Sequence, residues 1–272
     1  MVVFPNAKIN LGLQVLRKRP DGYHDLSSVF YPVPIADSLE ILPSSRPTHF
    51  TMWNRDIPGD LNQNLILRAY RLLRETYNLP EVEIHLIKNI PMGAGLGGGS
   101  ADATFALCAL NDLFSLQLSS DTLEDLALEL GSDCPFFVTN RPALVHGRGE
   151  HLTAIPHILR NTHILVVSPE THVSTAEAFG GIAPNDQRPD LAELIQLPRE
   201  QWKYHIANDF EQTIFPLHTE LSVIKQWLYD CGAFYASLTG TGSSIYGLFD
   251  HLPEVTPPDF GVDCQFDTAL LP

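Results

Sequence analysis

The sequence has no long hydrophobic run and little positive charge. No stretch approaches the roughly 18 apolar residues that cross a membrane, and the N-terminus lacks the basic start and apolar run of a signal peptide. The 272 residues contain 17 lysines and arginines against 32 aspartates and glutamates, giving a net charge of −15. Because nucleic acids and anionic membranes bind to electropositive surfaces, neither is expected as a partner. We therefore expect a soluble, cytoplasmic protein.

Cysteine and histidine are present, but they are not spaced for metal binding. The four cysteines stand far apart, at positions 108, 134, 231 and 264, and the eleven histidines form no H-E-x-x-H pair. Scattered cysteines are typical of free thiols in a reducing compartment, and this spacing predicts no zinc site. The sequence therefore predicts no metal ion held by protein side chains.

The hydrophobic pattern predicts a chain of mixed strands and helices in two parts. Residues 81–90 largely alternate between apolar and polar, which predicts a strand with one wet face. A polar stretch at 156–163 precedes a new apolar strand, so we expect one domain at 1–158 and a second at 159–272. Helices are predicted where apolar residues recur at helical spacing, over 62–79, 101–114, 121–130 and 219–230.

The segment IPMGAGLGGGS, residues 90–100, has five glycines within seven residues. Glycine loses more backbone entropy on folding than any other residue, so this density indicates a compensating gain, usually backbone N–H groups that close around a ligand. A strand precedes the loop and a helix follows it. We expect a phosphate cradle, in which Ser100 caps the helix and the positive end of that helix meets the anion.

The glycine-rich loop is open to three other interpretations. A P-loop is excluded because Gly99 is followed by Ser100 instead of lysine. A dinucleotide-binding turn fits the spacing of Gly93, Gly95 and Gly98, but the preceding strand alternates and no acidic residue ends a second strand about 20 residues further on. A glycine-rich turn without a ligand is the remaining alternative, and the adjoining serine and helix start disfavour it.

The stretch P-M-G-A-G-L-G-G-G-S-A, 91–101, closely resembles the phosphate-binding motif of the GHMP kinases, the family of galactose, homoserine, mevalonate and phosphomevalonate kinases. Four more stretches resemble motifs of that family in the same order along the chain: AKINLGL (7–13), RPDGYHDLSSVF (19–30), GSDCPFF (131–137) and LTGTGSSIYGLF (238–249). The chain departs from the pattern at Asn6, which follows Pro5, and at Ala101–Asp102, where relatives often have Ser-Asn. An acid near a triphosphate is unfavourable unless it faces away or meets the metal.

The resemblance implies an α+β, two-domain GHMP kinase fold. An N-terminal α/β domain like the second domain of ribosomal protein S5 would precede a ferredoxin-like C-terminal domain. The implied activity is ATP-dependent phosphorylation of the 2-hydroxyl of 4-diphosphocytidyl-2-C-methyl-D-erythritol, in non-mevalonate isoprenoid precursor biosynthesis. The alternatives are another small-molecule kinase of the family, of homoserine or mevalonate type, and a nucleotide-binding protein without activity.

The resemblance also implies the ligands. ATP is the expected co-substrate, with Mg²⁺ held mainly by its phosphates and by water. The expected partners are small molecules, with no nucleic acid, membrane or obligate protein partner. Residues matched to ATP binding are Asn64, Leu65, Lys88, Pro91, Met92, Gly93, Ala94, Gly95, Leu96, Gly97, Gly98, Gly99, Ser100 and Ala101. Residues matched to binding of the acceptor substrate are Asn10, Tyr23, His24, Thr175, Phe179, Gly240, Thr241 and Gly242.

Lys8 and Asp133 match the catalytic pair of the family. In phosphoryl transfer an aspartate can take the proton of the acceptor hydroxyl while a lysine offsets phosphate charge. On the residues alone, Lys8 could equally be a strand lysine whose ammonium reaches solvent. For Asp133 the residues alone favour a helix cap over a catalytic role. On the residues alone, Asn64 could likewise be only a helix cap, and Lys88 could be only a lysine at a solvated strand end. Tyr23 and Phe179 are expected to stack on a cytosine.

Overall fold

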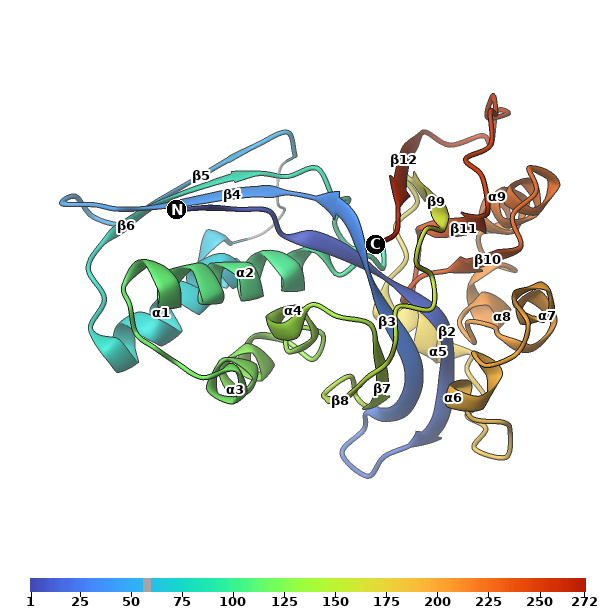
Figure 1. Ribbon diagram of the computed structural model, residues 1–272, viewed down its shortest axis with the longest axis horizontal. Coiled ribbons are helices and arrows are strands. Elements are labelled where there is room, and N and C mark those ends of the chain that lie inside the picture. Colours follow the sequence, from blue (N-terminus) through green and yellow to red (C-terminus); the bar gives the residue numbers. More distant parts are fainter. Residues whose placement is uncertain (56–59) are drawn as a thin grey trace. The chain divides into compact units, whose positions relative to one another are not determined.

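The computed structural model describes residues 1–55 and 60–272, and its chain forms two compact units (Figure 1). Neither unit is one continuous stretch, because the long strands β2 (Asn6–Lys18) and β3 (His24–Ala36) each contribute to both. The units therefore do not follow a single boundary after residue 158, and the expected division into domains stays a prediction. The first unit consists of Met1–Ala7, Ile35–Met92 and Gly97–Arg141, and the second of Lys8–Pro34, Gly93–Leu96 and Pro142–Pro272.

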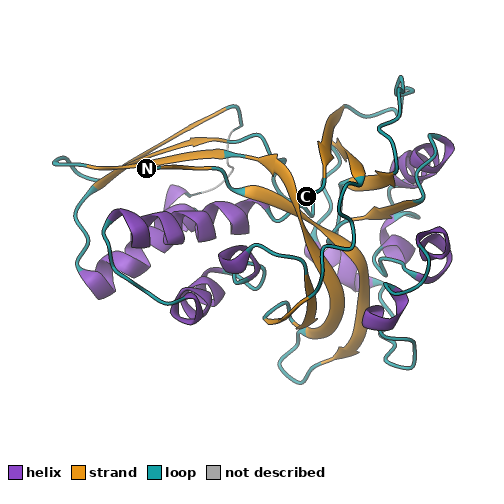
Figure 2. Ribbon diagram, viewed as in Figure 1, coloured by secondary structure: helices purple, strands orange, loops and turns teal. Residues whose placement is uncertain are grey.

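The first unit is a four-stranded sheet with helices packed on one face (Figures 1 and 2). The alternation expected over 81–90 is confirmed, since Val82, Ile84 and Leu86 are buried in the core. The strands stand in the order β1 (Val2–Val3), β4 (Ser38–Pro43), β6 (Val82–Ile87) and β5 (His49–Trp53), and only the pair β5–β6 is parallel. The helices are the 3₁₀ helix η1 (Leu61–Gln63), α1 (Leu65–Tyr77), α2 (Gly98–Leu113), α3 (Ser120–Leu130) and α4 (Phe136–Thr139).

The second unit contains two further four-stranded sheets within the described residues. One sheet has the order β2–β3–β7–β8, with β7 at Ala143–Gly147 and β8 at His151–Ala154. The other is antiparallel, in the order β10 (Tyr235–Leu238), β11 (Ile245–Phe249), β9 (His163–Pro169) and β12 (Cys264–Leu270). The helices are α5 (Thr175–Gly180), α6 (Leu191–Leu194), α7 (Arg199–His205), α8 (Glu211–Ile214) and α9 (Thr219–Asp230).

All four helices predicted from periodicity are present: α9 spans the predicted range, and the other three have shifted ends. Helix α2 begins at Gly98, three residues before the predicted start at 101. Gly97 has a positive φ of 71° and turns the chain into the helix, so the glycines that mark a loop in the sequence form the first helical turn. No helix in residues 1–55 or 60–272 is long and apolar enough to cross a membrane.

Candidate active site

The first turn of α2 exposes backbone donors at the end of the glycine loop. The first helical hydrogen bond runs from the N–H of Ala101 to the carbonyl of Gly97, at 2.9 Å. The N–H groups of Gly98, Gly99 and Ser100 therefore precede the hydrogen-bond ladder of the helix and point toward its positive end, which suits an anion. The expectation that Ser100 caps the helix is wrong, because the N-cap residue is Gly97, which offers only its backbone.

The tip of the glycine loop packs against the second glycine motif of the chain. A Cβ built on Gly95 would lie 1.9 Å from the carbonyl oxygen of Thr239, and one on Gly240 would lie 2.9 Å from the Cα of Gly95. The hydroxyl of Thr239 donates to the carbonyl of Gly95 at 3.0 Å, and the N–H of Ser244 donates to that of Ala94 at 3.1 Å. Some glycines of both motifs therefore serve close backbone contact, so glycine content alone does not identify ligand donors.

Asn10 is the centre of a buried polar network that orients Lys8. The ammonium of Lys8 donates to Asn10 Oδ1 at 2.6 Å and lies 4.5 Å from the ring centroid of Phe30. The same oxygen accepts from the N–H of Gly240 at 2.9 Å, and Asn10 Nδ2 donates to Ser28 Oγ at 2.8 Å. Lys8 is 3% exposed, so it is not a strand lysine whose ammonium reaches solvent. Sequence reasoning missed Ser28, which lies within the matched stretch 19–30.

Asp133 lies in the turn between α3 and α4. The N-cap residue of α4 is Pro135, so Asp133 does not occupy the cap position of that helix. The turn is fixed to α2, because the hydroxyl of Thr104 donates to the carbonyl of Cys134 at 2.9 Å. Burial raises the pKa of the neighbouring Cys134 thiol to about 11, so this cysteine stays neutral beside the aspartate.

Lys88 is buried in an ion cluster of the first unit. Its side chain is 1% exposed and its ammonium pairs with Asp37 and, at 2.9 Å, with Asp102. Asp37 Oδ1 also accepts the N–H groups of Asn89 and Ile90, at 2.6 and 2.9 Å. The alternative of a solvated strand end is therefore wrong for Lys88, and Asp37 is a further residue that sequence reasoning missed. Asp102, the acidic residue at which the chain differs from the family pattern, therefore lies against a cation.

Asn64 and Leu65 lie at the start of α1. The side chain of Asn64 accepts the N–H of Ile66 at 2.9 Å, so the helix-cap role of Asn64 is confirmed. A Cβ built on Gly99 would lie 3.9 Å from Leu65 Cδ1, so the start of α1 adjoins the first turn of α2. The remaining ATP-matched residues, Pro91, Met92, Gly93 and Leu96, belong to the loop that leads to this turn.

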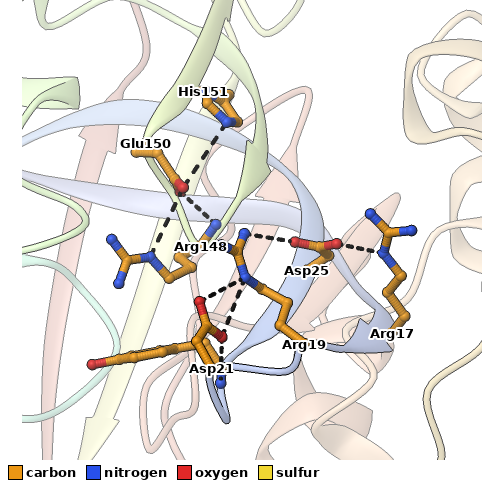
Figure 3. Close-up of polar contacts among 8 residues, drawn as sticks. Arg17, Arg19, Asp21, Asp25, Arg148, Glu150 and His151 are labelled. Carbon is orange, nitrogen blue, oxygen red and sulfur yellow. Dashed lines mark hydrogen bonds and ion pairs between the residues drawn. The ribbon is translucent and has the colours of Figure 1, made fainter.

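The hairpin that joins β2 and β3 presents Tyr23 and His24 differently. The tyrosine is 55% exposed, and the guanidinium of Arg148 lies 4.8 Å from its ring centroid. Glu150 accepts the backbone N–H of Arg148 at 2.5 Å, and Figure 3 shows its carboxylate between Arg148 and His151, beside the ion pairs of the hairpin. Tyr23 is therefore an open aromatic surface with a cation against it.

His24 stacks on Phe179, with ring centroids 4.8 Å apart and planes 22° apart. Partial burial, and secondarily the charge of Lys18, lowers the pKa of His24, so the neutral ring is favoured. Thr175 begins the helix that carries Phe179, and Ser174 caps it through the N–H of Glu177. The sequence expectation paired Phe179 with Tyr23 across a base, whereas the ring stacked on Phe179 in this structure is that of His24.

Comparison with known proteins identifies the family. Residues 64–141 match the GHMP kinases N terminal domain, and residues 186–256 match the GHMP kinases C terminal domain. The chain is 44% identical over 264 residues to the 4-diphosphocytidyl-2-C-methyl-D-erythritol kinase of Parabacteroides distasonis, with 97% of each chain covered. It is 47% identical over 262 residues to the enzyme of that name from Bacteroides thetaiotaomicron, with 95% of each covered. The chain therefore belongs to the GHMP kinases.

Solved structures agree with this assignment. A crystal structure of 4-(cytidine 5′-diphospho)-2C-methyl-D-erythritol kinase is 34% identical, with a TM-score of 0.78 over 91% of this chain and 90% of the other. The Methanococcus jannaschii mevalonate kinase has a TM-score of 0.71 at 14% identity, over 100% of this chain and 98% of the other, which shows a shared fold. The α+β GHMP kinase fold expected from the motifs is confirmed.

Proposed function

We propose that this kinase transfers the γ-phosphoryl group of ATP to the 2-hydroxyl of 4-diphosphocytidyl-2-C-methyl-D-erythritol. The observation that carries the proposal is similarity along nearly the whole chain, at 44–47% identity, to enzymes named for that substrate. The hairpin with Tyr23 and His24 supports it, because an exposed aromatic ring beside a neutral imidazole suits a nucleobase.

A coupled ADP-release assay over a panel of alcohols tests the substrate. We expect the specificity constant for the cytidyl compound to exceed those for homoserine, for mevalonate and for the uridyl analogue of the same diphosphate. A site that hydrogen-bonds the exocyclic amine of cytosine leaves buried groups unpaired with uracil. Equal constants for the cytidyl and uridyl compounds would contradict the proposed substrate, and would favour a family member that acts on a simpler alcohol.

In the proposed reaction, the carboxylate of Asp133 takes the proton of the acceptor hydroxyl. The hydroxyl oxygen then forms a bond to the γ-phosphorus, the bond to the β–γ bridging oxygen breaks, and ADP leaves. Lys8, held by Asn10, offsets the charge that develops on the transferred group. Asn10 and Ser28 act by fixing the direction of that ammonium.

Mg²⁺ is proposed to arrive with ATP, since phosphate oxygens and water satisfy its octahedral preference and it neutralises the charge on the phosphates. The described residues hold no cluster of three histidine, cysteine, aspartate or glutamate side chains that could bind a metal ion by themselves. We further propose a cytoplasmic enzyme that acts without an obligate protein partner. The net charge of −15 is unsuited to nucleic acid or anionic membranes.

Substitution of Gly99 tests the phosphate cradle. A side chain at the buried Gly98 would meet Lys88 Nζ and Ile90 Cγ2, each 2.9 Å from a built Cβ, and would disturb the fold. Gly99 is exposed and has only ordinary contact at 3.9 Å, so Gly99→Val is expected to fold normally while its side chain obstructs the phosphates. We expect the Kd for ATP to rise by about tenfold or more, from loss of at least one charge-assisted hydrogen bond.

The control for Gly99→Val is Gly180→Val, because a Cβ at Gly180 also has open space around it and that glycine is also helical. Calorimetric titration with ATP should give the parent Kd for this control. An unchanged Kd for folded Gly99→Val would contradict the proposal that the phosphates of ATP bind at the first turn of α2.

Replacing aromatic residues tests the proposed nucleobase pocket. Tyr23→Ala and Phe179→Ala should each raise KM for the cytidyl substrate by about tenfold, since base stacking is worth about 1–3 kcal/mol per base. KM for ATP should stay at the parent value. Tyr204→Ala is the matched control, because Tyr204 is a 73% exposed aromatic on α7. Steady-state kinetics in which KM for both substrates rises equally would argue for a general packing role instead.

A further inference from the structure

One ammonium group is shared by two buried carboxylates beside the start of α2. Asp37, Lys88 and Asp102 are 0%, 1% and 3% exposed, and the two acids together exceed the lysine by one negative charge. A buried charge is costly unless it is paired and hydrogen-bonded. The cluster therefore holds one charge too many when both acids are ionised.

The two carboxylates are held very unequally. Asp37 accepts two backbone N–H groups through Oδ1 and pairs with Lys88 through Oδ2, so both of its oxygens have donors. Asp102 pairs with Lys88 through Oδ2, while its Oδ1 is buried and has no hydrogen-bond partner among the described residues. An oxygen without a donor is far less costly in a neutral carboxyl than in a carboxylate. The extra proton of the cluster therefore belongs to Asp102.

The electrostatics of the site agree with this assignment. Burial raises the pKa of Asp102 to about 7, against the opposing effect of Lys88 and with a further contribution from Asp37. Lys88 and Asp37 are the charged groups in the described part of the chain that act on it. Cys134, from the segment beside α4 that packs on α2, is a neutral thiol at this pH. Near neutral pH the protonated form of Asp102 is therefore populated.

Lys88 connects this carboxyl to the donors of the first helical turn. A Cβ built on Gly98 would lie 2.9 Å from Lys88 Nζ, so the ammonium lies beside the residue that begins α2. Asp102 lies one turn further along the same helix. A protonated Asp102 leaves the ammonium less neutralised, and a polyanion at the helix start then meets a stronger positive potential.

We propose that Asp102 is a positioning residue that takes up a proton when ATP binds, and so strengthens the attraction of Lys88 and the start of α2 for the phosphates. The inference rests on the proposed binding of ATP at this turn. The coupling between the two binding events is reciprocal: protonation of Asp102 strengthens ATP binding, and bound ATP raises the proton affinity of Asp102. The balance is one proton from solvent onto a carboxylate oxygen of Asp102, with no covalent change in the nucleotide.

The test measures the affinity of the whole protein for Mg-ATP between about pH 6 and pH 9. If ATP raises the pKa of Asp102 by one unit, the Kd should rise by about five- to tenfold over this range. Calorimetry in buffers of different ionisation enthalpy should show uptake of up to about half a proton at pH 7. The nearly isosteric Asp102→Asn should bind with the Kd that the parent shows at low pH, and should lose both effects.

Comparing the parent with Asp102→Asn cancels the effect of the nucleotide's own titration, because that titration is the same with both proteins. Glu124→Gln on α3 is the matched control, because partial burial also raises the pKa of Glu124 and its charged neighbours are Asp121 and Asp125. This variant should keep the pH dependence of the parent. Equal pH dependence and proton uptake in the parent and Asp102→Asn would overturn the inference. A parent that does not bind ATP would instead overturn the proposed function.

A second measurement needs no nucleotide. It can be interpreted even if Asp102→Asn has a lower overall stability than the parent. The pKa of Asp102 is raised on folding from 3.8 to about 7, so its stabilisation is present below about pH 4 and is lost as pH rises through 7. Between these values the thermal midpoint of the parent should fall relative to that of Asp102→Asn. Parallel midpoint curves would show that Asp102 holds no proton in the folded protein.

Discussion

Replacing Asp133 by asparagine is expected to lower kcat by about a hundredfold or more, the usual effect of losing a general base. The amide keeps the shape of the side chain and can still accept a hydrogen bond, but it cannot take the proton of the acceptor hydroxyl. The thermal midpoint should stay near that of the parent, because asparagine is nearly isosteric with aspartate.

Single-turnover kinetics and a thermal melt on the same preparation check this result. Asp121→Asn is the matched control, since Asp121 is an exposed acid in the first turn of α3 and has no role in the proposed reaction. Its kcat should equal that of the parent. If the midpoint of Asp133→Asn collapses while the remaining folded enzyme works normally, Asp133 is a structural residue and the proposed base must be sought elsewhere.

Replacing Asp37 by alanine is expected to lower the free energy of unfolding by about 2 kcal/mol or more, because buried donors lose their acceptor while Lys88 keeps only Asp102 as a partner. The substitution also leaves the N–H groups of Asn89 and Ile90 without their carboxylate acceptor. Those residues lead into the glycine loop, so ATP affinity should fall as well.

Equilibrium unfolding in denaturant measures the loss. Asp230→Ala provides the control: Asp230 accepts a surface hydrogen bond from Gln226 on α9, and surface substitutions usually change stability by less than about 0.5 kcal/mol. A loss below about 1 kcal/mol for Asp37→Ala would mean that Asp102 alone balances Lys88 and that the N–H groups of Asn89 and Ile90 find another acceptor.

Local features of the molecule could be predicted from the sequence because they depend on residues a few positions apart. The helices α1, α2, α3 and α9 follow from apolar spacing, and Asn64 caps α1 by accepting a hydrogen bond from Ile66, two residues away. The turn before Tyr23 follows from Asp21–Gly22, where the carboxylate accepts the N–H of Tyr23 at 3.1 Å. The order of five motifs was enough to identify the family, because their spacing spans the chain from residue 7 to residue 249.

The partners of the site residues were decided by tertiary structure. Lys88 meets Asp37 from 51 positions away, and Thr239 meets Gly95 from 144 positions away. No periodicity or turn signal encodes such pairs, because they depend on strand register and on how closely two backbones approach. For the same reason the sequence could mark Asp102 as an unusual acid beside the phosphate loop, but only the fold shows that it is buried against a lysine already held by Asp37.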